Sequence, residues 1–482
     1  MGYLGLFTVV VAVGFSTVRG TALDDYVNKY DPTYTYKEIG TPFKGDGFTS
    51  YFINMTSQTW LTASEVSQSV WWHYLVINIP DEVQFSDTGL LYLTGGGNHD
   101  GIPDITSSDC LFTTVTCFST GTVTATLFQI PNQPIVFEYD SLHKSRTEDA
   151  IIAFTWYYFL NHPDDPEYLL RLPMTKAAVR ALDTMASFAA KLNPALNLTK
   201  FVVAGASKRG WTTWTTGAVD PRVVGIVPIV LDELNLNKNL HHHYRAYGGW
   251  SFAFNDYYQL NITQYLDSNN IELMASIIDP LSYVSRLTMP KLLITTGGDE
   301  FFLPDDSYYF WDSLQGEKHL RTLPNAEHSC AGHYTSLVLS LRSFYLSILL
   351  KGSRPVMNWV LNQTADGGYI YLQANQKPAI VTLYHATTVQ SQRRDFRLLT
   401  GPPESPVPQP VFWFNNILSP DSNGNYVAKV AMPQDGWRAF FIQATFPGPG
   451  GSVFEFTTQV NIIPNTFPYP DCQGTGCLGT LV

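Results

Sequence analysis

A serine, an aspartate and a histidine occur along the chain in positions that suit nucleophilic catalysis. Ser207 follows an apolar run and stands in the small-residue turn Gly205-Ala206-Ser207-Lys208-Arg209-Gly210, which precedes a segment of helical character. A strand that turns sharply into a helix holds a serine hydroxyl clear of the sheet, as in a nucleophile elbow. Asp299 and His328 come later, and this order is that of α/β-hydrolases, whereas chymotrypsin and subtilisin have different orders. The sequence therefore predicts a serine hydrolase.

Each of these three residues has a predicted role and a competing interpretation. Ser207 would attack the substrate after His328 takes its proton, and Asp299 would orient the imidazole. Arg209 stands where the Gly-x-Ser-x-Gly motif has its second glycine, so a structural turn serine is the alternative for Ser207. The alternatives for the other two positions are Glu300, Asp305 and Asp306 for the acid, and His333 for the base.

An oxyanion hole needs backbone N–H groups that point at the developing negative charge. One predicted donor is the amide of Lys208, the residue after the nucleophile. The second is predicted in the loop Thr94-Gly95-Gly96-Gly97-Asn98-His99, with Gly96 as the chosen residue, because glycines allow close approach of the backbone to a substrate. An ordinary glycine-rich turn is the alternative for this loop.

Other chemistry-bearing residues give weaker signals. Lys208 and Arg209 are candidates for binding a substrate carboxylate, or are helix-surface charges. The run His241-His242-His243 does not predict a metal site, because consecutive side chains point in different directions. The aromatic-rich stretch from Tyr244 to Tyr265 would form a lid or pack in the core. No metal and no cofactor are expected.

The elements around these residues alternate between strands and helices. Apolar runs predict strands at 90–94, 135–139, 201–206, 223–230 and 291–295, and the spacing of apolar residues predicts a helix over 175–192. Such alternation predicts a mostly parallel sheet covered by helices, with its active site at the carboxyl ends of the strands. After about residue 355, short β-type runs separated by Pro, Gly and Asn predict a small β-sandwich. The expected division is residues 21–355 for an α/β-hydrolase-like domain and 356–482 for a β-rich domain.

Composition limits the classes of partner. The chain has 482 residues and a formal net charge of −12, and it lacks the clustered Lys and Arg that binding to nucleic acid requires. Its best candidate for a membrane span, residues 334–350, carries Arg342 near the centre and reads as a buried helix. Neither a nucleic acid partner nor a membrane span is expected.

Several features predict export. The apolar run 4–15 is typical of a signal peptide, residues 1–20, with cleavage after Gly20 or Ala22. Four Asn-x-Thr sites predict N-glycosylation, namely Asn54, Asn197, Asn261 and Asn362. In an oxidising compartment, closely spaced cysteines predict the disulfides Cys110–Cys117, in a loop, and Cys472–Cys477, in the tail. Cys330 would then be a buried free thiol. The expected location is secreted and extracellular.

Several motifs together resemble one known family. The segments are Gly205 to Thr212, Tyr247-Gly248-Gly249-Trp250, Arg393-Arg394-Asp395-Phe396-Arg397, Gln133-Pro134 and the Asp-Ala that follows Glu148. They are similar to those of the PhoPQ-activated pathogenicity-related protein family, which includes secreted autocrine proliferation repressors. The resemblance runs from about residue 25 to about 465. It implies an α/β-hydrolase fold, and the scattered functions of the family leave the substrate open.

Two classes of function follow. The first is a secreted serine hydrolase that acts by acyl transfer on peptide or ester substrates through Ser207, His328 and Asp299. The second, implied by the resemblance, is a secreted autocrine signalling protein that binds a cell-surface receptor on an α/β-hydrolase scaffold. Both classes can exist on one chain.

Overall fold

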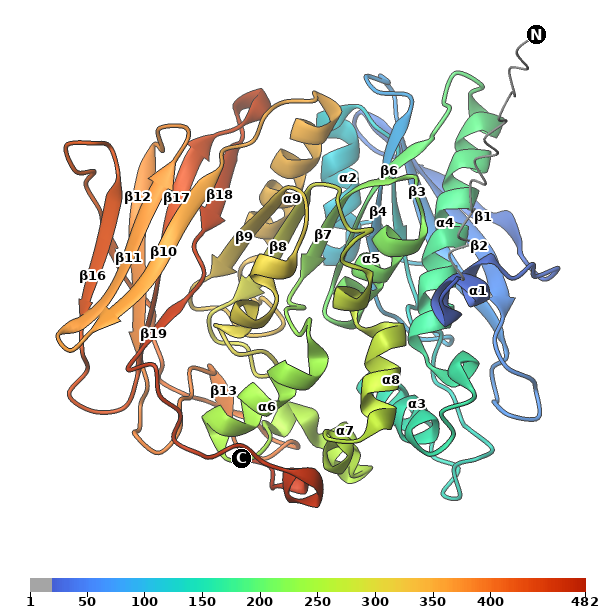
Figure 1. Cartoon of the computed structure of the whole chain (residues 1–482). Coiled ribbons are helices and arrows are strands. Elements are labelled where there is room, and N and C mark those ends of the chain that lie inside the picture. The colour runs from blue at the N-terminus through green and yellow to red at the C-terminus, as the bar shows by residue number, and fades with distance from the viewer. Residues whose placement is uncertain (1–19) are drawn as a thin grey trace, which may run out of the picture.

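The computed structural model describes residues 20–482 (Figure 1). The predicted signal peptide, up to residue 19, lies outside the described residues. The first described helix, α1 (Ala22–Asn28), begins at a capping box, because the Thr21 hydroxyl accepts from the Asp24 N–H while the Asp24 carboxylate accepts from the Thr21 N–H. The two reciprocal bonds satisfy N–H groups at the helix start and fix where this helix begins.

A nine-stranded sheet forms the centre of the molecule, with the strand order β1-β2-β3-β5-β4-β6-β7-β8-β9. Neighbours are parallel from β5 to β9, whereas β1, β2, β3 and β5 pair antiparallel in succession. The strands are β1 (Thr35–Lys44), β2 (Phe48–Thr59), β3 (Val70–Pro80), β4 (Thr88–Leu93), β5 (Thr124–Leu127), β6 (Lys200–Ala206), β7 (Val223–Ile229), β8 (Lys291–Thr296) and β9 (Lys318–Leu323). The predicted α/β-hydrolase fold is confirmed.

Helices cover both faces of the parallel strands because alternate residues of a strand point to opposite faces. On β4, Leu91 and Leu93 pack in one buried cluster with the side chains of α4 and α5, whereas Leu90 and Tyr92 belong to a second cluster with α2 and α9. Burial on both faces explains why these strands read as continuous apolar runs. The helices are α2 (Ser108–Thr120), α3 (Asp149–Asn161), α4 (Arg171–Leu192), α5 (Lys208–Val219), α6 (Leu236–Tyr247), α7 (Asn255–Gln259), α8 (Asn269–Ile278) and α9 (Tyr334–Leu349).

The C-terminal part consists of antiparallel sheets, as the sequence predicts. It contains a three-stranded sheet ordered β10-β11-β16, a five-stranded sheet built on β15-β12-β17-β18 with β19 on β17, and the small pair β13-β14. The strands are β10 (Met357–Thr364), β11 (Gly367–Ala374), β12 (Ile380–Thr387), β13 (Leu399–Thr400), β14 (Val407–Pro408), β15 (Phe414–Ile417), β16 (Tyr426–Ala431), β17 (Arg438–Pro447), β18 (Val453–Thr457) and β19 (Asn461–Ile463).

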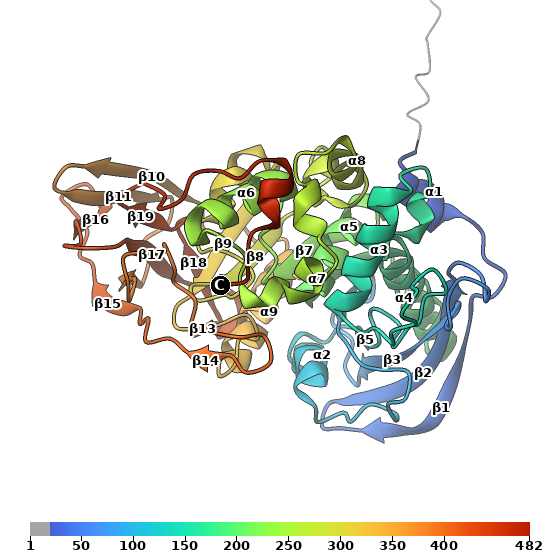
Figure 2. The same cartoon turned by 90° about the horizontal axis from the view of Figure 1, so that it is seen from below.

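These sheets lie at one end of the molecule and β1 and β2 at the other, as both views show (Figures 1 and 2). The C-terminal sheets contact the central sheet directly, through strands β18 and β9. The Thr322 N–H of β9 donates to the Thr457 hydroxyl at 3.0 Å, and the ring of His319 stacks on Phe456 of β18. Apolar side chains of α9 and of the C-terminal strands share one buried cluster, so the two parts are packed together.

The end of the chain returns to the first part and packs beside helix α6 (Figure 2). The Trp250 indole N–H donates to the carbonyl of Cys477 at 2.9 Å, and the Trp250 amide donates to the carbonyl of Thr480 at 2.8 Å. The last residues of the β-rich region therefore hold the segment that follows α6, which borders the site described next.

Candidate active site

Ser207 occupies a strained turn between β6 and α5. Its backbone has φ 56° and ψ −127°, a conformation that non-glycine residues rarely adopt. The Ser207 N–H donates to the carbonyl of Ile229 on β7 at 2.8 Å, which fixes the turn against the neighbouring strand. Tight packing requires the small neighbours, because a Cβ at Gly205 would lie 2.8 Å from the Arg209 carbonyl and one at Gly210 would lie 2.9 Å from the Ile229 carbonyl. The predicted elbow geometry is present.

The structure brings Ser207, His328 and Asp299 together although they are far apart in the sequence. His328 Nε2 lies 2.8 Å from the Ser207 Oγ, and His328 Nδ1 lies 2.9 Å from both carboxylate oxygens of Asp299. Asp299 follows β8 and His328 follows β9, so both reach the carboxyl end of the parallel strands. The distances are those of hydrogen bonds through which a base can take a serine proton while an acid orients the base.

Backbone donors hold the Asp299 carboxylate in place. The N–H groups of Phe301 and Phe302 donate to Asp299 Oδ1 at 2.8 and 3.2 Å, and the Thr296 hydroxyl donates to Oδ2 at 3.2 Å. Only 3% of Asp299 is exposed. A buried, fully bonded carboxylate of this kind keeps a partner imidazole in one orientation.

The alternatives to Asp299 and His328 occupy other positions. Glu300 accepts the backbone N–H of His328 at 3.1 Å, and its side chain does not bond the imidazole. Asp305 pairs with Arg394 and His242, and Asp306 accepts the N–H of Leu303. His333 precedes helix α9, where its carbonyl accepts from Leu337, and its side chain has no hydrogen bond within residues 20–482.

Electrostatics favour the protonated form of His328. Burial lowers the pKa of the imidazole, but the charge and hydrogen bond of Asp299, with a contribution from Glu300, outweigh burial and raise that pKa above its ordinary value. Burial, together with the charge of Asp299, raises the pKa of Glu300 to about 7. The pKa values of His328 and of the neighbouring Glu300 are therefore both raised, and perturbed values of this kind are typical of functional sites.

The first residue of α5, Lys208, presents an N–H that has no carbonyl partner within the helix. In the glycine loop after β4, Thr94 and Gly95 line the cleft beside Ser207, whereas Gly96 does not. The Thr94 N–H is engaged by the Leu127 carbonyl, and the Gly95 N–H has no acceptor within the described range 20–482. The Gly96 N–H likewise has no acceptor there. The loop lies beside the serine as expected, and Gly95 rather than the predicted Gly96 borders the cleft.

The side chains of Lys208 and Arg209 are engaged with acidic residues of the protein. Lys208 Nζ lies 3.0 Å from Glu148 Oε2 and 2.9 Å from Asp149 Oδ2, and Arg209 Nη2 lies 2.6 Å from Glu148 Oε1. Burial works to raise the pKa of Glu148, yet the charges of Arg209 and Lys208 lower it well below its usual range. The two cations are thus neutralised, and their availability to a substrate carboxylate is low.

Arg209 also explains the departure from the second glycine of the elbow motif. Its Nε donates to the Ile130 carbonyl, and a Cβ at Gly95 would lie 2.7 Å from its Nη2. The guanidinium therefore packs under the glycine loop and ties it to α5. Sequence reasoning gave Glu148 no role, and the only signal was the family-like Asp-Ala pair after it.

One predicted disulfide is present and the other is absent. Cys472 and Cys477 are bonded, whereas Cys110 and Cys117 are free and buried. The prediction of a Cys110–Cys117 loop was wrong because both lie on helix α2, and seven residues of helix separate them by about 10 Å along the axis. A disulfide needs Cα atoms within about 7 Å. Cys330 is free and buried, as expected.

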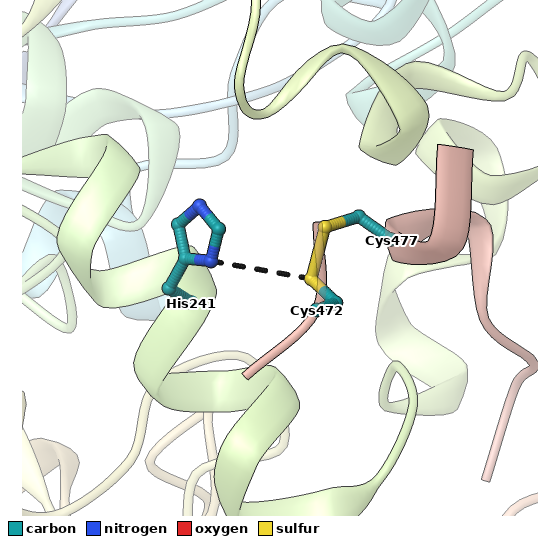
Figure 3. A group of neighbouring side chains, drawn as sticks. All are labelled: His241, Cys472 and Cys477. Carbon is teal, nitrogen blue, oxygen red and sulfur yellow. Dashed lines mark hydrogen bonds between the residues drawn. A yellow bond between two sulfur atoms is a disulfide. The ribbon is translucent and has the colours of Figure 1, made fainter. Parts of the chain in front are cut away.

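His241 lies beside the disulfide, so a histidine and two sulfurs meet at one place (Figure 3). His241 Nδ1 is 4.0 Å from the Cys472 Sγ and 2.8 Å from Asp471 Oδ1. Metal ions bind cysteine as the thiolate, and sulfur atoms joined in a disulfide offer none. His242 and His243 of the same helix are buried in other contacts, with Asp305 and with the N–H of Ser251.

The four predicted glycosylation sites differ in accessibility. Asn197, Asn261 and Asn362 are exposed, and Asn54 is half-buried on strand β2. Across residues 20–482, no helix combines the length and apolar character needed to cross a membrane.

The central sheet, the Ser207 turn and the serine–histidine–aspartate arrangement define an α/β-hydrolase fold. The chain belongs to the PhoPQ-activated pathogenicity-related protein family, whose model matches residues 23–397. Autocrine proliferation repressor protein A of Dictyostelium discoideum is 39% identical over 480 residues, which cover 96% of this chain and 94% of that protein.

Solved structures of esterases are more distantly similar. The acetyl xylan esterase from Paenibacillus sp. R4 has a TM-score of 0.47 and 14% identity, with 66% of this chain and 91% of that chain covered. The acetyl xylan esterase 1 from Thermoanaerobacterium sp. JW/SL YS485 has a TM-score of 0.44 and 16% identity, with coverage of 67% and 93%. With TM-scores this low, the fold assignment depends on the topology of the sheet and the Ser207 turn.

Proposed function

We propose that this protein is a secreted serine hydrolase that transfers the acyl group of an ester or peptide substrate to Ser207 and then to water. The observation that carries the proposal is the continuous hydrogen-bonded chain from the Ser207 Oγ through His328 to Asp299. The tail disulfide is consistent with export from the cell.

Ser207 and His328 each have a defined step in the proposed reaction. The Ser207 Oγ forms a bond to the substrate carbonyl carbon while its proton passes to His328 Nε2. The carbonyl oxygen becomes an oxyanion beside the N–H groups of Lys208 and Gly95, which need no reorganisation to donate. His328 then gives its proton to the leaving group as the carbon–leaving-group bond breaks. A water molecule, deprotonated by His328, releases the acid and restores Ser207.

The experiment that tests this proposal is hydrolysis of p-nitrophenyl esters by the full secreted chain. Turnover of the wild type should exceed that of Ser207→Ala by ~10⁴–10⁶-fold, because the triad acts as a unit. Ser276→Ala removes an exposed serine on α8 and should keep the wild-type rate. Equal rates for wild type and Ser207→Ala would refute the proposal.

A second function is favoured by the 39% identity to an autocrine proliferation repressor. In this alternative the chain acts on cells by binding a receptor, and a hydroxyl at the bottom of a cleft has no part in that contact. Proliferation assays on cells that receive the wild-type protein or Ser207→Ala separate the two functions. If Ser207→Ala restrains proliferation as the wild type does, signalling is independent of hydrolysis. Loss of restraint together with loss of turnover would join them.

A further inference from the structure

Two hollows meet at Ser207, and they differ in size and in the residues they contain. One is a cleft of about 280 Å³, and the other is a narrower cavity of about 30 Å³. Ser207, Lys208 and Phe301 line both. His328 and Gly95 line only the larger cleft. The two hollows can therefore hold different parts of one substrate.

The chemistry of acyl transfer assigns those parts. His328 must donate a proton to the departing group, so that group has to lie on the side of Ser207 where His328 is. The larger cleft meets this requirement, and the attacking water must also arrive there because His328 deprotonates it. The acyl chain is the other substituent of the carbonyl carbon. The acyl chain therefore occupies the smaller cavity.

The wall of the smaller cavity is mostly apolar, and its charged groups are engaged with the protein. Aromatic and aliphatic side chains make up most of it, namely Ile152, Trp156, Trp211, Leu231, Leu240, Phe254, Phe301 and Phe302. Lys208 pairs with Asp149, and the Arg171 guanidinium donates to the Lys208 carbonyl at 2.6 Å.

Glu233 is the one carboxyl in this wall without a partner. Only 9% of Glu233 is exposed, and its side chain has no hydrogen bond within residues 20–482. Burial, followed by the charge of Asp232, raises the pKa of Glu233 well above its usual range. Burial therefore favours the neutral acid over the carboxylate at this position, and a charged acyl chain would find no free cation in the wall, since Lys208 and Arg171 are engaged with the protein.

The volume limits the length of that chain. One water-sized group needs a cavity of roughly 10–15 Å³. A cavity of about 30 Å³ therefore holds about two such groups beyond the carbonyl carbon. Acetyl has one carbon there and propionyl has two, whereas butyryl has three.

We propose that the cavity lined by Leu240 and Ile152 is an acyl pocket. It selects esters whose acyl chain is short and carries no charged group, with acetyl and propionyl as the preferred groups. This inference rests on the proposed hydrolase function and narrows its substrate class. Longer chains would have to displace the buried aromatic side chains of the wall, and overpacking of that kind is unfavourable.

The test is a series of p-nitrophenyl esters that share one leaving group, from acetate through propionate and butyrate to octanoate. We expect kcat/KM to be highest for acetate or propionate and to fall by at least ~10-fold at butyrate, as one extra methylene does in a filled pocket. A maximum at octanoate, or hydrolysis of none of these esters by a protein whose Ser207 takes a fluorophosphonate, would overturn the acyl pocket. A folded protein that takes no label and hydrolyses no ester would instead overturn the hydrolase function.

Widening the cavity provides a second arm. Leu240 on α6 is 4% exposed, and Leu240→Ala should raise the ratio of butyrate to acetate kcat/KM by ~10-fold or more. Leu314, also 4% exposed and in the same buried cluster but outside the cavity, is the matched control, and Leu314→Ala should keep the wild-type ratio. Ile152→Val removes a single methyl group, so it perturbs folding less and should shift the ratio in the same direction. Wild-type ratios in both cavity variants would refute the pocket.

Discussion

The Ser207 end of the central sheet contains non-glycine residues with strained backbone conformations, whereas the C-terminal sheets, within the described residues, contain none. Ser207, Val230 and Cys330 have φ values of 56°, 43° and 55°, and all three line the cleft. In residues 20–482, every non-glycine residue with a positive φ precedes β10. A strained backbone of this kind costs about 1–3 kcal/mol per residue and persists where the surroundings impose it.

Two buried aspartates, one in each region, differ in how they are paired. Asp232, next to the Ser207 site, is buried, one of its carboxylate oxygens has no hydrogen bond, and burial raises its pKa well above the usual range. In the C-terminal part, the buried Asp395 is paired with Arg397 at 2.6 Å. Carboxyl groups with strongly perturbed pKa values are typical of functional sites, so Asp232 supports the proposed assignment of chemistry to this end of the sheet.

The largest effect expected from this comparison is on turnover. His328→Ala should lower kcat on p-nitrophenyl acetate by ~10⁴–10⁶-fold, because the serine then has no base. His385 lies on β12 of the C-terminal sheets, and His385→Ala should keep the wild-type rate. Comparable losses in the two variants would break the contrast between the two regions.

Asp299→Asn should lower kcat by about 10⁴-fold, because the amide favours the wrong tautomer of His328 and cannot stabilise the imidazolium. The fold should persist, since an amide oxygen can still accept from the N–H of Phe301. Steady-state kinetics and a thermal melt on the same preparation check both statements. A loss below ~10-fold would assign the orienting role to another acid.

A substitution in the C-terminal sheets should act on stability and spare the chemistry. Phe440 on β17 is fully buried in the cluster shared with α9, and Phe440→Ala should lower the free energy of unfolding by about 3–5 kcal/mol. Chemical denaturation measures this change. The folded fraction should retain wild-type kcat, and a specific loss of kcat would show that these sheets help to shape the site.

The smallest effect concerns pH. Since the pKa of His328 is raised, and the base must be neutral, kcat/KM of the wild type should fall as pH drops through a value above about 6.5. The Glu300 carboxylate helps to raise that pKa, so Glu300→Gln should move the acidic limb toward lower pH. A limb that moves to higher pH, or a profile flat from about pH 5 to 8, would contradict an imidazole base.

The parallel core and the three site residues were predictable because their signals are local. Strands β4, β6, β7 and β8 are buried on both faces and read as apolar runs. The small residues around Ser207 indicate a tight turn. The strand predicted at 135–139 was wrong, since this apolar stretch crosses the core as a loop with only single bridges to Arg146 and Val66. Apolar content alone does not separate the two cases.

Other features of the site depend on distant contacts. Arg209 pairs with Glu148, which lies in a distant segment of the chain. The cavity beside Ser207 is lined by Glu233 and Leu240, among others. No spacing in the sequence predicts either arrangement. The choice between Gly95 and Gly96 depends on which glycine borders the cleft, and the sequence does not show this. The Cys110–Cys117 error has a local origin instead, because the segment that forms helix α2 was interpreted as a loop.

The most direct test of the central claim is peptide-resolved mass spectrometry after exposure of the folded protein to a fluorophosphonate. The reagent reacts with a serine whose proton a positioned base removes and whose oxyanion is stabilised. We expect a single label on the peptide that contains Ser207, absent from Ser207→Ala and strongly reduced in His328→Ala. A folded wild-type protein that remains unlabelled, or one labelled at another serine, would contradict acyl transfer through Ser207.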